Sequence, residues 1–233
     1  MKTFRWFVAL GVFLFMAQGN AEEEGAPRNE KEKLSYSIGM EIGKNFKKQS
    51  IDVDPEVLLK GIQHAISGSK ALMTDQEVRE TLTAFQKERR AKQEEEMREL
   101  GEKNRKEGEA FLAANKEKEG VKTLPSGLQY KVIKPGTGKK PKSTDTVTTH
   151  YRGTLIDGTE FDSSYKRGQP ATFPVKGVIP GWTEVLQLMK EGAKWQLFVP
   201  PNLAYGERGA GHAVGPNATL IFEVELISIQ EKK

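Results

Sequence analysis

The sequence of 233 residues contains no cysteine. This absence excludes disulfide bonds, a catalytic thiol and a lipid-modified cysteine at a cleavage site. Histidine is also scarce: His64, His150 and His212 lie far apart, and no metal-ligand spacing joins them. We therefore expect neither a metal ion nor another cofactor.

Long apolar runs are absent too, with one exception at the N-terminus. Lys2 and Arg5 precede an apolar segment at 6–17, and small residues follow it up to Ala21. This order is typical of a secretory signal peptide over residues 1–21, and we expect cleavage after Ala21. The alternative is an uncleaved membrane anchor, but the run is shorter than the roughly 20 residues that a spanning helix needs. After cleavage we expect no integral membrane segment.

Charge of one sign is not in large excess. The formal net charge of the full chain is +4, and loss of Lys2 and Arg5 with the signal peptide would lower it by two. So small a charge gives no support for a nucleic-acid partner, and we expect none. Export of a protein without cysteine suits an oxidising compartment. The simplest prediction is a bacterial periplasm, with association with the outer membrane as a further option.

Two helices are expected near the start of the mature chain. We expect residues 22–29 to be disordered. Apolar residues then recur at a spacing of four from Leu34 to Phe46, which predicts an amphipathic helix. Asp54 followed by Pro55 is typical of the start of a second helix, since aspartate caps well and proline fits the first helical position.

The two helices leave an apolar stripe without a covering partner. Two short helices cannot enclose a core, so a second copy of the chain is the natural cover. We therefore assign residues 30–73 to an all-α homodimerisation domain. The alternative is that Gly39, Met40 and Gly43 serve ordinary packing within one subunit. The stripe comprises Ile38, Met40, Ile42 and Phe46.

A long helix should follow. Residues 74–77 have the spacing of a capping box, which opens a helix. Residues 87–107 contain acidic and basic side chains in nearly equal number, and few apolar ones. Such a segment favours a solvated single helix with ion pairs along its surface. We predict a connecting helix over 74–115, about 60 Å long at about 1.5 Å per residue, followed by a linker at 116–122.

From Thr123 onward the pattern changes to short β-type runs separated by Pro-Gly and Asp-Gly turns. This order predicts an α+β domain over residues 123–231, with an antiparallel β-sheet wrapped on one short helix. The predicted strands span 128–133, 146–155, 171–175, 194–199 and 218–230, and the predicted helix spans 183–190.

Several aromatic residues and one acid occur where these strands meet turns. Taken singly, Trp182 or Phe222 would be ordinary core, and Asp162 would be a turn cap. Their combination at these positions is typical of a concave apolar pocket with a few polar groups. The motifs are the segment from Tyr151 to Ser164, the segment Val178-Ile179-Pro180-Gly181-Trp182, and Leu203-Ala204-Tyr205-Gly206.

These motifs resemble the FKBP-type peptidyl-prolyl cis-trans isomerases. The runs 124–132 and 215–222, with the helical region ahead of them, look like the bacterial macrophage infectivity potentiator (Mip) subgroup, and the resemblance covers nearly the whole chain. It implies accelerated rotation of Xaa-Pro bonds in exported or unfolded proteins, without a nucleophile or metal. It also implies a V-shaped dimer with chaperone activity. The implied partners are unfolded or proline-containing polypeptides and macrolide inhibitors.

The resemblance also implies the site residues. Trp182 would form the pocket floor, and Asp162 would be a partly buried acid facing the reacting amide and paired with Arg167. The Tyr205 hydroxyl and the Ile179 N–H would hold substrate carbonyls. The implied catalytic residues are Asp162, Tyr205, Phe161 and Trp182, and the implied substrate-binding residues are Tyr151, Arg167, Val178, Ile179, Phe222 and Val214.

The sequence departs from the best-known eukaryotic members of that family around the pocket. Ala171 replaces an aromatic residue, Ala210 a histidine and Ala213 a larger apolar residue, while the loop 173–179 is two residues shorter. Ala171 is usual in the Mip subgroup, so we expect a more open rim with altered selectivity, and the affinity for macrolides is left open. An alternative function is a non-catalytic periplasmic holdase chaperone. A weaker alternative is a host- or surface-interaction protein.

Overall fold

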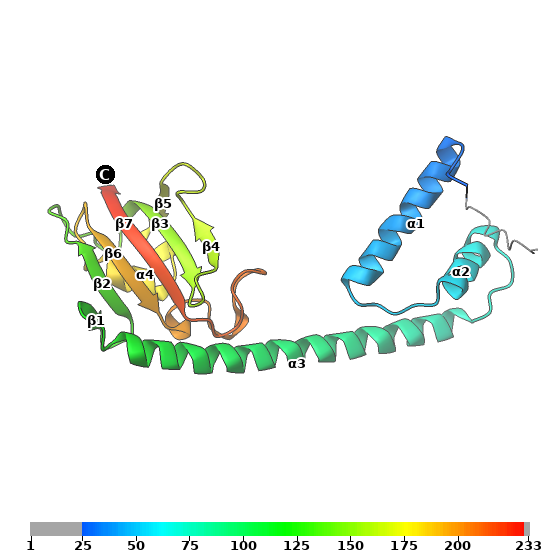
Figure 1. Cartoon of the computed structure of the whole chain (residues 1–233), viewed down its shortest axis with the longest axis horizontal. Coiled ribbons are helices and arrows are strands. Elements are labelled where there is room, and N and C mark those ends of the chain that lie inside the picture. The colour runs from blue at the N-terminus through cyan, green and yellow to red at the C-terminus, as the bar shows by residue number, and fades with distance from the viewer. Residues whose placement is uncertain (1–24, 231–233) are drawn as a thin grey trace, which may run out of the picture. The chain divides into compact units, whose positions relative to one another are not determined.

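The structure is a computed structural model that describes residues 25–230 (Figure 1). The expected signal peptide and its cleavage site lie outside these described residues. The chain divides into two compact units after Thr74, and each is treated by itself. Residues 25–28 have no regular secondary structure.

The first unit contains two capped helices. Helix α1 (Glu30–Lys48) begins after Asn29, whose side chain accepts a hydrogen bond from the backbone of the first turn. Helix α2 (Pro55–Ser67) begins after Asp54, whose carboxylate accepts two backbone N–H groups, and it ends at Gly68 in the left-handed conformation. The start of α2 follows the Asp54 cap and the Pro55 position expected from the sequence, whereas the Asn29 cap of α1 was not predicted.

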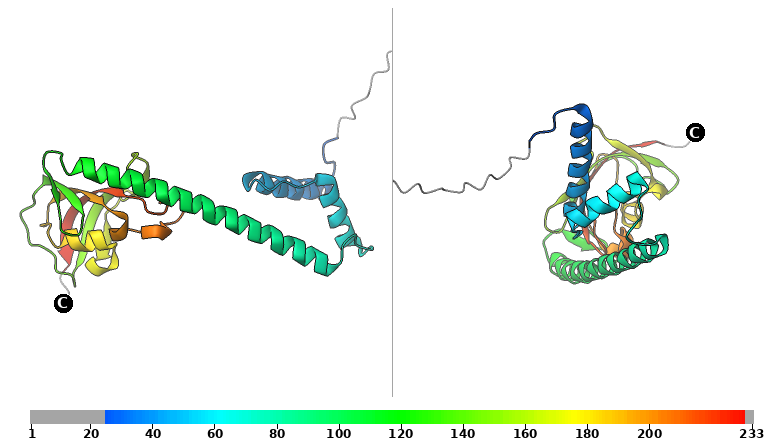
Figure 2. Two further views of the ribbon diagram at one scale, coloured as in Figure 1. Left: turned by 90° about the horizontal axis from the view of Figure 1, so that it is seen from below. Right: turned by 90° about the vertical axis from the view of Figure 1, so that its right-hand side faces the viewer.

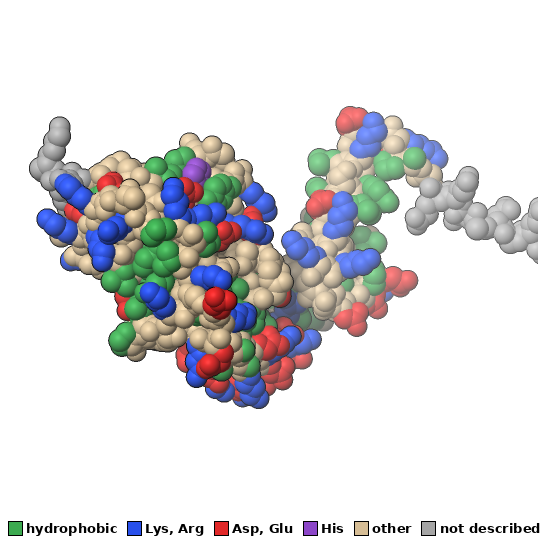
Figure 3. Space-filling model, turned by 60° about the vertical axis from the view of Figure 1, so that its left-hand side comes forward, with side chains coloured by type: hydrophobic (Ala, Val, Ile, Leu, Met, Phe, Trp, Pro, Cys, Tyr) green, Lys and Arg blue, Asp and Glu red, His purple; other side chains and the backbone are tan. Residues whose placement is uncertain are grey.

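Neither α1 nor α2 contains a buried residue. Figure 3 shows hydrophobic side chains (green) on the outside of this unit. Leu34 is 62% exposed and Ile38 is 53% exposed, and Met40 on the same helix is exposed as well. Exposed apolar side chains at helical spacing are typical of a surface that contacts another protein.

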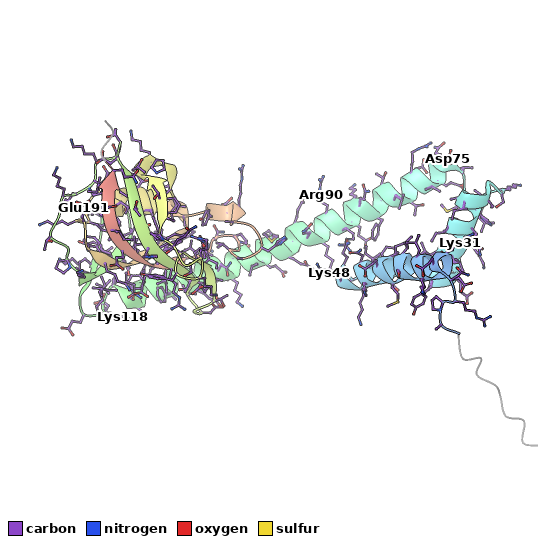
Figure 4. The ribbon with its side chains drawn as sticks, turned by 90° about the horizontal axis from the view of Figure 1, so that it is seen from above. Lys31, Lys48, Asp75, Arg90, Lys118 and Glu191 are labelled. Carbon is purple, nitrogen blue, oxygen red and sulfur yellow. The ribbon has the colours of Figure 1, made fainter. Side chains whose placement is uncertain are left out.

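The second unit begins with the expected long helix, α3 (Asp75–Asn115). In its N-terminal part the side chains point outward on all sides of the ribbon, as Figure 4 shows between Asp75 and Arg90. The buried residues of the helix lie further on, at Gly101, Gly108 and Asn115. A spacing of seven residues places them on one face. That face packs on the β-rich domain, against which the C-terminal part of α3 lies in both views of Figure 2.

Seven antiparallel strands form one sheet in the order β1-β2-β6-β7-β3-β4, and β5 also pairs with β3. The α+β class expected from the sequence is confirmed. The strands are β1 (Val121–Thr123), β2 (Gln129–Lys134), β3 (Thr146–Leu155), β4 (Glu160–Ser163), β5 (Ala171–Pro174), β6 (Lys194–Val199) and β7 (Leu220–Gln230).

Three features differ from the sequence-based expectation. Strands β1 and β4 were not expected as separate strands, and β1 begins at Val121, inside the segment assigned to a linker. The short helix, α4, spans Pro180–Leu186, so the expected range 183–190 was displaced. Pro180 occupies the first helical turn, where its missing N–H costs nothing. Three short 3₁₀ turns, Val175–Gly177, Pro201–Leu203 and Gly206–Arg208, complete the domain.

The core lies between α4 and the concave side of the sheet. Along β7 buried and half-buried residues alternate, as expected for a strand with one face on the core. A Cβ at Gly181 would lie 2.7 Å from a side-chain atom of β6, so the missing side chain lets α4 approach the sheet closely. The buried residues include Leu128, Val147, Trp182, Val185, Leu186, Met189, Leu197, Val199, Leu220, Val224 and Leu226.

Candidate active site

A cavity of about 420 Å³ opens at the N-terminal end of α4. Its walls come from β3, β4, β5, β7, the start of α4 and the loop after β6. The structure brings together eight of the ten expected site residues in this lining, and it adds Phe173 and Gly177. The lining residues are Tyr151, Phe161, Asp162, Phe173, Gly177, Val178, Ile179, Trp182, Tyr205 and Phe222.

Trp182 is the centre of the aromatic part of the cavity and is only 4% exposed. Its ring meets Tyr151 edge-on at 5.2 Å between centroids and Phe222 at 5.4 Å. Phe173 adds a third edge-on contact at 6.0 Å, and Phe161 meets Phe222 at 5.5 Å. Edge-to-face pairs of this kind stabilise one another beyond simple burial. The rings therefore form a rigid apolar surface.

A glycine makes this ring arrangement possible. A Cβ at Gly153 on β3 would lie 2.6 Å from the Phe161 ring and 2.9 Å from the Phe222 ring. Both distances are shorter than a carbon–carbon contact allows. Neither Gly153 nor Phe173 was singled out in the sequence, although Gly153 stands within the Tyr-Arg-Gly part of the motif.

Three polar side chains meet at one side of the cavity. The Tyr151 hydroxyl donates a hydrogen bond to one carboxylate oxygen of Asp162 at 2.5 Å. Arg167 donates to the other oxygen, forming the expected ion pair, and it also donates to the Tyr151 hydroxyl at 2.7 Å. Arg167 itself is not a lining residue, and its contribution to the cavity is through its hydrogen bonds to Asp162 and Tyr151. The closed set of contacts fixes both Asp162 oxygens.

The charge states of this group follow from its contacts. Burial raises the pKa of Asp162, but the hydrogen bonds from Tyr151 and Arg167 outweigh it, and the net pKa is below the ordinary value. Burial, and then the hydrogen bond to Asp162, raise the pKa of Tyr151. At neutral pH the pair is therefore a carboxylate and a neutral phenol. The Asp162 side chain is 40% exposed, so solvent screens its charge in part.

Two residues of the lining, Tyr205 and Ile179, carry hydrogen-bond donors. Tyr205 is 41% exposed, and no hydrogen bond joins its hydroxyl to another residue in the described part of the chain. Burial and the negative charge of Asp162 raise the pKa of Tyr205, so the hydroxyl keeps its proton. Ile179 is the N-cap of α4, and the N–H of an N-cap residue is not used inside the helix.

Val214, which was expected to bind substrate, is not among the described lining residues of the cavity and is 4% exposed. Its side chain belongs to the hydrophobic core, and its backbone pairs with Ala210 in an isolated antiparallel bridge. Within the described residues, no cluster of three or more His, Cys, Asp or Glu side chains is suited to a metal ion.

None of the described helices is both long and apolar enough to cross a membrane.

Two family models match the chain. The model described as FKBP-type peptidyl-prolyl cis-trans isomerase matches residues 137–227. The model described as the domain amino terminal to FKBP-type peptidyl-prolyl isomerase matches residues 31–132. Together they cover the described helices and the β-rich domain.

Individual proteins give the same result over most of the chain. The sequence is 55% identical to the outer membrane protein MIP of Legionella longbeachae over 202 residues, which is 87% of each protein. It is 48% identical to the peptidyl-prolyl cis-trans isomerase Mip of Coxiella burnetii over 227 residues, 97% of each. The crystal structure of FkpA from Escherichia coli aligns with a TM-score of 0.68 at 39% identity, covering 88% of this chain and 99% of that chain.

Proposed function

The chain belongs to the FKBP-type peptidyl-prolyl cis-trans isomerases, and we propose that the cavity above Trp182 is where it rotates Xaa-Pro bonds of exported or unfolded proteins. The observation that supports this site is the cavity itself. Its volume of about 420 Å³ and its aromatic lining suit a prolyl ring with its neighbouring backbone, because small-ligand sites are mostly apolar hollows of this size with a few polar groups.

The chemistry requires no bond to be broken. Resonance makes the prolyl C–N bond partly double, and rotation crosses a barrier of ~20 kcal/mol. In the half-rotated state the nitrogen loses conjugation and the carbonyl is less dipolar than in the planar amide. An apolar, water-poor cavity therefore penalises the half-rotated amide less than the planar one. This difference in binding accelerates the rotation.

The polar side chains would orient the substrate. The Tyr205 hydroxyl and the Ile179 N–H would donate to carbonyl oxygens on either side of the prolyl bond, which fixes the chain while the bond turns. Asp162 would face the reacting amide, held as an anion by Tyr151 and Arg167. Phe161 and Val178 would complete the apolar walls around the prolyl ring.

An isomerisation assay on a short proline peptide tests this site. We expect the mature chain to accelerate the exchange and Tyr205→Phe to lower kcat/KM about three- to tenfold, because one hydrogen bond of about 0.5–1.5 kcal/mol is lost. Circular dichroism establishes that the variant is folded. A mature chain that bound proline peptides while leaving them at the spontaneous rate would instead support the alternative, a non-catalytic holdase chaperone.

We also propose that the first unit joins two copies of the chain. The exposed apolar side chains of α1 and α2 support this, because such a surface is unfavourable in water. A dimer would present two isomerase domains to one unfolded client, which supports a chaperone role beside the isomerase activity. Chromatography with light scattering on the mature chain measures the mass directly, and a monomer at micromolar concentration would contradict the proposal.

The proposed location is the periplasm, after export across the inner membrane. The order of residues 1–21 supports export, and the Legionella longbeachae relative is named as an outer membrane protein. Cell fractionation with an antibody against the mature chain separates the periplasm from the outer membrane. N-terminal sequencing of the recovered protein tests cleavage after Ala21.

A further inference from the structure

The loop that follows Tyr205 rests directly on helix α3. The Asn104 side chain of α3 donates a hydrogen bond from Nδ2 to the Pro216 carbonyl oxygen at 2.8 Å, across 112 positions of sequence. The Asn217 side chain is 3.5 Å from the Gly101 carbonyl oxygen of the same helix. These contacts join the connecting helix to the loop that directly follows Tyr205, a lining residue of the cavity.

The contact surface is tight on both sides. A Cβ at Gly101 would lie 3.3 Å from the Asn217 side chain and 3.4 Å from the Pro216 ring. A Cβ at Gly215 would lie 3.0 Å from Asn104 Nδ2 and 3.3 Å from Leu100. Glycine on each side therefore lets the helix and the loop touch. Because interiors are close-packed, a helix in such contact limits where the loop can lie.

The loop transmits this contact to the cavity. The Asn217 N–H donates to the Gly206 carbonyl at 2.8 Å, and Gly206 follows Tyr205 directly. Asn217 has a φ of 52°, in the left-handed region, which asparagine tolerates better than most residues with a side chain. Within the described chain, the Tyr205 hydroxyl makes no hydrogen bond that would hold the ring. The position of that side chain therefore depends on its backbone.

We propose that Asn104 is a positioning residue for the isomerase reaction. It acts through Pro216, Asn217 and Gly206 to hold Tyr205 at the rim of the cavity. The C-terminal part of α3 is then a functional part of the active site as well as a connector. The gain is pre-organisation, because a loop fixed before binding pays less ordering entropy when the substrate arrives. This inference rests on the proposed role of Tyr205.

A double-mutant cycle on the mature chain tests the inference. The four proteins are the wild type, Asn104→Ala, Tyr205→Ala and the double variant, assayed with one short proline peptide. We expect Asn104→Ala to lower kcat/KM about three- to tenfold, the effect of about one hydrogen bond. In the Tyr205→Ala background the same change should alter kcat/KM by less than about twofold.

Two further variants serve as controls. Gln93→Ala removes an amide from an exposed position of the same helix and should keep wild-type kcat/KM. Asn104→Asp keeps the size of the side chain but cannot donate to the Pro216 carbonyl, so it should behave like Asn104→Ala. Each protein is assayed well below its melting temperature, which removes any contribution from unfolding.

The outcomes separate this inference from the proposed role of Tyr205. If Tyr205→Ala lowers kcat/KM but Asn104→Ala does not, the positioning role is wrong and the role of Tyr205 stands. An equal effect of Asn104→Ala in both backgrounds means that Asn104 acts on the reaction independently of Tyr205, which also overturns the inference. If Tyr205→Ala has no effect, the role of Tyr205 fails first, and positioning through it fails with it.

Discussion

Gly153→Ala should damage the active site without adding or removing any polar group. The added Cβ would lie 2.6 and 2.8 Å from two atoms of the Phe161 ring and 2.9 Å from the Phe222 ring. Carbon atoms prefer about 3.5–4.0 Å, so the two rings must move by roughly 0.5–1 Å. Both rings line the cavity, and Phe222 also packs on Trp182. The displaced rings therefore change the shape of the site.

The expected size follows from this overlap. Overpacking of a core costs about 1–3 kcal/mol, which lowers the melting temperature of the isomerase domain by about 2–12 °C at 2–4 °C per kcal/mol. Misplacement by up to 1 Å can reduce an enzyme rate by up to about a hundredfold, so we expect kcat/KM for a proline peptide to fall at least about tenfold.

A second substitution makes the reasoning refutable. Phe161→Leu removes the ring atoms that meet the new methyl group, so the Gly153→Ala/Phe161→Leu protein should unfold at a higher temperature than the sum of the single effects predicts. Calorimetry on the four proteins measures this coupling. If the changes in melting temperature are additive, or if Gly153→Ala keeps the wild-type kcat/KM, the positions of the two rings do not depend on the absence of a side chain at residue 153.

Three further predictions concern charge and assembly. Asp162→Asn should lower kcat/KM roughly tenfold with little loss of stability, because a partly exposed ion pair contributes about 1 kcal/mol or less; unchanged kinetics would remove Asp162 from the reaction. The pH profile of kcat/KM should be flat from about pH 5 to 8, because the pKa of Asp162 is lowered from 3.8 and that of Tyr205 is raised from 10.0. The stability that Asp162 contributes is present above its unfolded pKa and is lost as pH falls through the lower folded pKa; an inflection near pH 6.5 would instead indicate a histidine. Ile38→Asp, on the exposed stripe of α1, should convert a dimer to a monomer by sedimentation while the rate per site on short peptides stays the same.

The regular elements could be predicted where the sequence carries a strong local signal. Strands β3 and β6 have the bounds expected from their β-type composition, 146–155 and 194–199. Helix α3 spans the range set by its capping signal and its charged surface. Strands β1 and β4, of three and four residues, carry no strong local signal of their own. Both exist through pairing with β2 and β3, which is a tertiary effect.

Helix α4 shows a second kind of miss. The helix was expected to begin at Thr183, after Pro180 and Gly181. The structure starts it at Pro180 and buries Gly181 against β6 and Leu128. Local propensity disfavours glycine within a helix by about 1 kcal/mol. Close packing of α4 on the sheet outweighs that preference, and packing between elements distant in sequence is not visible in a local pattern.

The site was predicted best where its residues carry chemistry. Aromatic rings, an acid and a tyrosine at turn edges have few roles in common besides forming a pocket, so they could be grouped from the motifs. Phe173 stands alone in a short strand and offered no such signal. Val214 stands in the loop that follows Tyr205, but its side chain is 4% exposed and belongs to the core. Proximity along the sequence did not predict the direction of its side chain.

The arrangement explains why this catalyst depends on shape more than on titration. Near the cavity the pKa of Asp162 is lowered, and those of Tyr151 and Tyr205 are raised, so each stays in one charge state at neutral pH. A reaction that moves no proton gains nothing from a group poised near pH 7. Such a reaction is favoured by cavity walls that stay rigid while the prolyl bond rotates. Edge-on aromatic packing, which the absence of a side chain at Gly153 allows, supplies the walls. The contact of α3 with Pro216 and Asn217 would hold the backbone that follows Tyr205.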